Sequence, residues 1–128
     1  MVNQGTGNDN VKLIFACSGA ADVGELSDRA TRALHREGKG KMYCLAGIGA
    51  GLDNFVEITK SSAEILVIDG CPVDCAKKTI ENAGIIKFDH IRITDLGFQK
   101  GATTIDNNAI EIVVAKGRSI LKEVYNVM

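Results

Sequence analysis

Residues Glu64–Asp69, with the sequence EILVID, decide how the rest of the chain is interpreted. The four central residues of this stretch are all apolar. A continuous apolar run of this length is typical of a parallel β-strand that is buried on both faces of its sheet. Such a strand needs helices on both sides, so the flanking sequence should supply them.

Three further stretches predict strands. Residues 12–17 (KLIFAC) and 41–46 (KMYCLA) are short apolar runs, and residues 90–94 (HIRIT) alternate polar and apolar side chains as a strand near a sheet edge does. The intervening segments have apolar residues at helical spacing. They predict helices within residues 18–40, 52–62, 72–84 and 104–128.

Glycines mark where these helices should end. Gly38 and Gly84 are expected to terminate the first and third, and Gly117 leaves the last as one helix or two. The glycine-rich residues 47–51 predict a turn before the second helix, and the third helix is expected to start near Pro72.

The alternation of strands and helices predicts an α/β fold. We expect a small doubly wound, mainly parallel four-stranded sheet with helices on both faces, Rossmann-like or flavodoxin-like, with the strand order left open. The chain has 128 residues, which suits one domain. Residues 1–10 are expected to be a disordered leader and residues 11–128 a single domain.

Composition and charge exclude several function classes. The net charge is −1, from 15 basic and 16 acidic residues without a Lys/Arg run, so we expect no nucleic-acid partner. No stretch approaches the roughly 20 apolar residues of a membrane span, and the polar leader is not a signal peptide. We therefore expect a cytoplasmic protein. A homodimer through the exposed fourth strand and last helix stays open, and the sequence names neither a protein partner nor a small-molecule substrate.

The cysteines carry the functional hypothesis. Cys17, Cys44 and Cys71 are separated by 27 residues in each case, close to the roughly 30 residues of one βα unit. Each should therefore follow a strand at the same edge of a parallel sheet. In a reducing compartment, such cysteines are more often metal ligands or catalytic thiols than disulfides.

Cys75 is expected to add a fourth thiol, one helical turn beyond Cys71. The helix N-terminus carries partial positive charge, which favours thiolates. Zinc bound by four thiolates, with Zn–S of about 2.3 Å, is the first hypothesis. Its proposed ligands are Cys17, Cys44, Cys71 and Cys75. The alternatives are an iron–sulfur cluster, thiol redox or sulfur-transfer chemistry with the same cysteines, and plain filling of the core.

Other polar residues are expected at the same edge. Asp69 could orient a metal ligand, and Ser18 could donate to a thiolate or cap a helix. Asp95 should follow the fourth strand, and Asp74 is expected to cap the third helix. His90 should begin the fourth strand, at the end opposite the cysteines, so it is not expected to be a ligand.

The glycine-rich loop supports a third hypothesis, an enzyme that holds an anionic small molecule. Gly47 and Gly49 precede a helix, where backbone N–H groups can bind anions. Leu52, however, occupies the place of the last glycine in a GxGxxG pattern. Close approach of the backbone to the thiols is the simpler role for these glycines. Catalytic residues stay unassigned.

Four blocks of the sequence together resemble the DGC-domain proteins, a family of small prokaryotic proteins. The blocks are CSGAADVGELSDRA, KMYCLAGIGAG, VIDGCPVDCAKK and RITDLG, within about residues 13–102. The family is named for a motif that stands here as Asp69-Gly70-Cys71. The resemblance implies a zinc-binding role, itself proposed from the cysteine pattern, and no activity comes with it. Every cysteine that this pattern would use is present.

Overall fold

Strand β3 (Glu64–Asp69) lies at the centre of the sheet, as its apolar sequence predicts. The computed structural model describes residues 11–121. In it, β3 is flanked by β1 (Lys12–Ala16) and β4 (Asp89–Arg92), and the short β2 (Lys41–Met42) lies outside β1. All neighbouring strands are parallel, in the order β2-β1-β3-β4. The predicted α/β class is confirmed, and the order is that of flavodoxin-like sheets.

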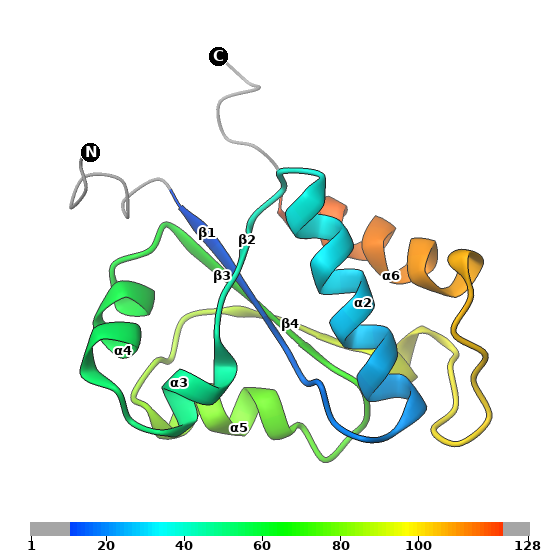
Figure 1. The fold of residues 1–128 in the computed structure, drawn as a ribbon, viewed down its shortest axis with the longest axis horizontal. Coiled ribbons are helices and arrows are strands. Elements are labelled where there is room, and N and C mark those ends of the chain that lie inside the picture. Colours follow the sequence, from blue (N-terminus) through cyan, green and yellow to red (C-terminus); the bar gives the residue numbers. More distant parts are fainter. Residues whose placement is uncertain (1–10, 122–128) are drawn as a thin grey trace.

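Helices cover both faces of this sheet (Figure 1). The helices are α2 (Asp22–Arg36), α3 (Leu45–Gly49), α4 (Asp53–Lys60), α5 (Cys75–Asn82) and α6 (Asn107–Ile120), and Ile93–Leu96 form a 3-10 turn, η1. Apolar residues of α2 and α6 pack on one face of the sheet. Those of α3, α4 and α5 pack on the other.

The two halves of the core follow from the alternation of side chains along each strand. Ile14 and Leu66 face α2 and α6, whereas Phe15 and Val67 face α3 and α5. All four are fully buried. A parallel strand buried in this way cannot alternate apolar with polar residues, which is why β3 could be identified from its sequence.

Three predicted element boundaries are wrong. Residues 47–51 were expected to be a turn, yet Gly47 and Gly49 belong to the short helix α3, which shortens β2 to two residues. Helix α5 begins at Cys75 and not near Pro72. The fourth strand ends at Arg92, and the chain then forms η1.

The predicted ends of two helices are confirmed. Gly38 and Gly84 have φ angles of 78° and 85° and follow α2 and α5, as expected. Helix α6 runs through Gly117 without a break, and this residue lies against the side chain of Leu34. The predicted leader, residues 1–10, and the end of the predicted domain, residues 122–128, lie outside the described residues.

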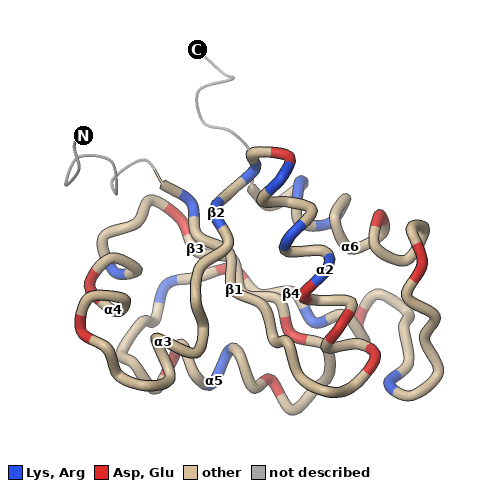
Figure 2. Tube along the Cα trace, viewed as in Figure 1, with Lys and Arg blue, Asp and Glu red and all other residues tan. Residues whose placement is uncertain are grey.

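Charged side chains are distributed along the elements with both signs (Figure 2). In α2 the first turn holds the acidic Asp22 and Glu25, and the last turn holds the basic His35 and Arg36. The helix dipole stabilises charges placed in this way. Within residues 11–121 no helix has the length and apolar character needed to cross a membrane.

Candidate functional site

The four cysteines follow the strands at the carboxyl edge of the sheet. Cys17 comes directly after β1, Cys44 and Cys71 come two residues after β2 and β3, and Cys75 is the first residue of α5. Cys17 and Cys71 are partly buried, and Cys44 and Cys75 are exposed. In a doubly wound sheet this edge is where ligands bind.

The sulfur atoms do not meet there. Across residues 11–121, no three cysteine sulfurs lie within 4.8 Å of one another. Thiolates that share a zinc ion lie about 3.8 Å apart, given Zn–S bonds of about 2.3 Å. The thiol donors suit zinc, but their spacing does not form a closed four-thiolate site in this structure.

The chain direction after β3 explains the separation. Ala16 pairs with Ile68, and the Cys17 N–H continues this ladder by donating to the Ile68 carbonyl at 2.9 Å. The Cys17 side chain packs with the α3 and α5 core. Beyond Asp69 the chain bends toward α2, and Cys71 packs with the α2 and α6 core. The two thiols therefore lie on opposite sides of the sheet.

Gly70 permits this bend. A Cβ atom at Gly70 would lie 2.8 Å from the carbonyl carbon and oxygen of Val23 and 2.9 Å from the Gly24 nitrogen. These are backbone atoms in the first turn of α2 and cannot move aside cheaply. The middle residue of the Asp-Gly-Cys motif must therefore lack a side chain.

Cys44 caps helix α3. Its Sγ accepts a hydrogen bond from the Gly47 N–H at 3.3 Å, so this N–H is not free for the predicted anion site. A Cβ at Gly47 would lie 2.9 Å from the ring of Phe55, which gives that glycine a packing role. Cys44 also lines a hollow of about 450 Å³ together with Arg32 and Thr79.

Cys75 is the first residue of α5, and Thr79, four residues later, projects from the same face of this helix. The Thr79 methyl group would be 3.5 Å from a Cβ at Gly49 in α3, and Thr79 lines the same hollow as Cys44. Cys17, Cys44 and Cys75 thus share the α3 and α5 side of the carboxyl edge, whereas Cys71 does not.

Cys71 has a separate environment. Its Sγ lies 3.7 Å from the Lys100 ammonium. The loop that carries Lys100 is held by Asp22, which accepts hydrogen bonds from the backbone N–H groups of Gly101 and Thr103. These bonds keep the pKa of Asp22 below its usual value. The spacing of cysteines in the sequence could not predict this long-range contact.

Asp69, and not Asp74, caps helix α5. The Asp69 carboxylate accepts from the Ala76 N–H at 2.8 Å and from the Lys77 N–H at 2.9 Å, and it is only 1% exposed. Asp74 occupies the N-cap position without a capping bond from its side chain. The prediction that Asp74 caps the helix is therefore wrong.

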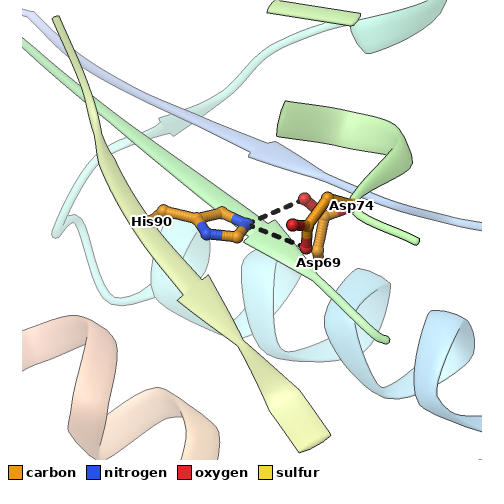
Figure 3. Close-up of side chains that lie close together, drawn as sticks. All are labelled: Asp69, Asp74 and His90. Carbon is orange, nitrogen blue, oxygen red and sulfur yellow. Dashed lines mark hydrogen bonds and ion pairs between the residues drawn. The ribbon is translucent and has the colours of Figure 1, made fainter. Parts of the chain in front are cut away.

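His90 was expected at the end of the sheet opposite the cysteines, and this too is wrong. Strand β4 is short and starts beside Leu66, so His90 pairs with Val67 in the second half of β3. Its Nε2 lies 2.9 Å from Asp69 and 3.8 Å from Asp74 (Figure 3). The sequence shows where this strand is, but not its register.

Asp69, Asp74 and His90 place one potential metal-ligating atom each within 4.8 Å of one another, and no other such group occurs among the described residues. The carboxylates, however, already have strong donors. Arg92 binds Asp74 through two parallel bonds, Nη2 to Oδ2 at 2.6 Å and Nε to Oδ1 at 2.9 Å. These bonds lower the pKa of Asp74 and raise that of Arg92. We therefore interpret the group as a polar network.

Two other predicted residues have ordinary partners. The Ser18 hydroxyl donates to Asp28 at 2.8 Å, and Asp95 in η1 lies 3.3 Å from Arg92. Neither residue has a bond to a cysteine sulfur among the contacts of residues 11–121.

Comparisons with known proteins agree with the sequence blocks quoted above. A family model described as the DGC domain matches residues 13–116. A curated relative from Pseudomonas aeruginosa, the "Anaerobic and virulence modulator AnvM", is 30% identical over 93 residues, which cover 73% of this chain and 71% of the relative. No solved structure matches the chain.

Proposed function

The chain belongs to the DGC-domain family, and from this premise we propose that it binds a metal ion, zinc in the first place, through cysteine thiolates at the carboxyl edge of the sheet. Thiolate sulfur binds zinc and also softer metal ions such as Cu(I). All four cysteines are free of disulfides.

Three of the cysteines are the proposed ligands. Cys17 packs with the core under α3 and α5, and Cys44 lines the hollow that Thr79 of α5 also lines. Cys75 starts the same face of α5 as Thr79, which assigns it to this side of the sheet, whereas Cys71 packs on the other side. This division is the observation that carries the proposal. It favours a site with three protein ligands over a closed site with four. Because the sulfurs are not yet in contact, binding must draw them together.

A zinc ion with three protein ligands keeps one exchangeable position and can act as a Lewis acid or pass the metal on. The protein residues hold the thiolates ready for this. The Gly47 N–H donates a hydrogen bond to the Cys44 sulfur and holds it at the start of α3. The start of α5 places Cys75 where the helix dipole favours an anion.

Metal analysis of purified protein tests the proposal. We expect about one zinc per chain after anaerobic purification and no visible colour. Single Cys→Ser changes at positions 17, 44 and 75 should each weaken zinc binding by more than the roughly 10–100-fold that supporting residues contribute. Cys71→Ser is the matched control and should retain the metal. An equal loss in Cys71→Ser would overturn the three-ligand site, and a metal-free wild-type protein would overturn the function.

A second function, thiol exchange or sulfur transfer, is favoured by the surroundings of Cys44. This thiol is exposed, accepts a backbone hydrogen bond and borders a hollow of about 450 Å³ that Arg32 also lines. Such a hollow is large enough for a small thiol-bearing partner. A metal-free protein in which Cys44 reacts fastest with iodoacetamide would select this function. Brown protein containing iron and sulfide would instead select a cluster. Equal, slow labelling of all four thiols would exclude exchange at Cys44.

The name of the Pseudomonas relative describes a modulator. Applied to this chain, it suggests that the thiol site serves a regulatory output. Transcript profiles of cells carrying the wild type or Cys44→Ser, grown with and without oxygen, would check this. Identical profiles in both conditions would argue against a regulatory role.

A further inference from the structure

The turn between β3 and α5 has an unusual backbone at Asp74. Its φ angle is 59°, and it is the one non-glycine residue with positive φ in the described part of the chain. Few residues other than glycine adopt this left-handed conformation without cost. The Asp74 N–H donates to the Cys71 carbonyl at 3.1 Å and closes the turn. The next residue, Cys75, begins the helix.

The side chain of Asp74 is held from strand β4. Arg92 binds both of its oxygens in a planar fork, at 2.6 and 2.9 Å. The Asp74 side chain is only 11% exposed and that of Arg92 is 28% exposed, so the carboxylate is the more shielded partner. A forked guanidinium–carboxylate pair fixes orientation as well as distance. Arg92 therefore restrains the rotation of the peptide that leads into Cys75.

The helix that follows has a second attachment, at Asp69. It binds the N–H groups of Ala76 and Lys77 and is itself held by His90 Nε2. The first attachment comes from Arg92 in β4, and the second comes from Asp69 at the end of β3, which His90 of β4 holds in turn. They lie on either side of Cys75 in the sequence, at Asp74 and at Ala76.

We propose that Arg92, acting through Asp74, is a positioning residue that fixes the start of α5 and thereby keeps the Cys75 thiol on the side of the sheet where Cys17 and Cys44 lie. For its metal readout this inference rests on the proposed function. Its effect on the backbone does not, since the fork is formed by protein side chains alone.

Arg118 offers a matched control. It also forms ion pairs with two carboxylates, Glu37 at the end of α2 and Glu111 within α6, and none of these bonds involves a cysteine or the turn before α5. Its side chain is 36% exposed, comparable to the 28% of Arg92. Arg118→Gln removes similar bonds without touching the turn.

Amide hydrogen exchange on metal-free protein gives the first test. Arg92→Gln should speed exchange at Ala76, Lys77 and Lys78 by about tenfold or more, the loss expected for one charged hydrogen bond. Exchange in β1 should not change, and Arg118→Gln should leave all three amides as in the wild type. Unchanged exchange in Arg92→Gln would overturn the inference whether or not the protein binds metal.

Asp74→Gly separates the ion pair from the backbone conformation. Glycine adopts positive φ at little cost, so this variant keeps the turn and loses the fork. In its background, Arg92→Gln should have no further effect on the three amides. Arg92→Lys, which keeps the charge but cannot form the fork, should exchange at a rate between the wild type and Arg92→Gln. A full additional effect of Arg92→Gln in the Asp74→Gly background would show that Arg92 does not act through Asp74.

Zinc affinity gives the second test. Arg92→Gln should weaken binding by about tenfold, and it should have no further effect once Cys75 is already serine. Equal weakening with and without Cys75, or equal weakening by Arg118→Gln, would mean that Arg92 acts only on general stability. If the wild type binds no zinc, the proposed function fails, and hydrogen exchange alone decides on Arg92.

Discussion

Replacing Asp69 with alanine removes the acceptor of three hydrogen bonds at once. The carboxylate is 1% exposed and binds the N–H groups of Ala76 and Lys77 and the Nε2 atom of His90, at 2.8, 2.9 and 2.9 Å. Water cannot easily replace it, because Ala76 is fully buried. The variant should therefore lose the cap of α5 and leave buried donors without partners.

The size of the loss follows from these contacts. Losing a helix N-cap costs about 0.5–2 kcal/mol, and each buried donor left without a partner adds about 1–3 kcal/mol. The N–H of Ala76 is the donor that stays most buried. We expect Asp69→Ala to lower the free energy of unfolding by about 3 kcal/mol, which corresponds to roughly 10–15 °C in Tm for a chain of this size.

Urea unfolding followed by circular dichroism measures this difference. The midpoint should fall while the slope stays constant, since the surface exposed on unfolding does not change. Asp53→Ala is the control, because Asp53 is an exposed first residue of α4. It should change stability by less than about 0.5 kcal/mol. A loss below about 1 kcal/mol in Asp69→Ala would refute the assignment of this carboxylate as the cap.

Three further predictions concern packing and pH. Gly70→Ala should cost about 2–3 kcal/mol, because its Cβ would lie 2.8 Å from the backbone of α2; a urea midpoint equal to wild type would contradict this. Gly117→Ala gains about 1 kcal/mol of helix propensity, but its Cβ would lie 2.6 Å from the fully buried Leu34. We therefore expect the free energy of unfolding to fall by about 1 kcal/mol in total, and a stabilised variant would show that Leu34 can move. Arg92 lowers the pKa of Asp74 below its ordinary value of 3.8. The pair therefore stabilises the fold fully above about pH 4, and this stabilisation is lost as the pH falls through the lowered pKa of Asp74. Acid unfolding of Arg92→Gln should therefore show a smaller loss of stability below about pH 4 than the wild type, and identical acid curves would count against the pair.

The parts of the fold that depend on local sequence could be predicted. Strand β3 was predicted from Glu64 to Asp69 and is found there, because polar residues bound its apolar run. Gly38 and Gly84 end their helices because positive φ is a local property of glycine. The start of α5 was missed because the turn before it is held by Arg92, far along the chain.

The candidate site shows the same limit. The equal spacing of Cys17, Cys44 and Cys71 indicated where each follows its strand. It did not indicate on which side of the sheet each thiol lies, since this depends on the bend at Gly70 against the first turn of α2. His90 was placed at the wrong end because strand register depends on pairing between strands and not on the residues of one strand.

X-ray absorption at the zinc edge of metal-loaded protein would test the central claim most directly, because it counts the sulfur atoms around the ion. With Cys17, Cys44 and Cys75 as ligands, the spectrum should fit three sulfur atoms at about 2.3 Å and one lighter donor at about 2.0 Å. It should stay unchanged in Cys71→Ser. Four sulfur atoms in the wild type, falling to three in Cys71→Ser, would contradict the division of the thiols across the sheet.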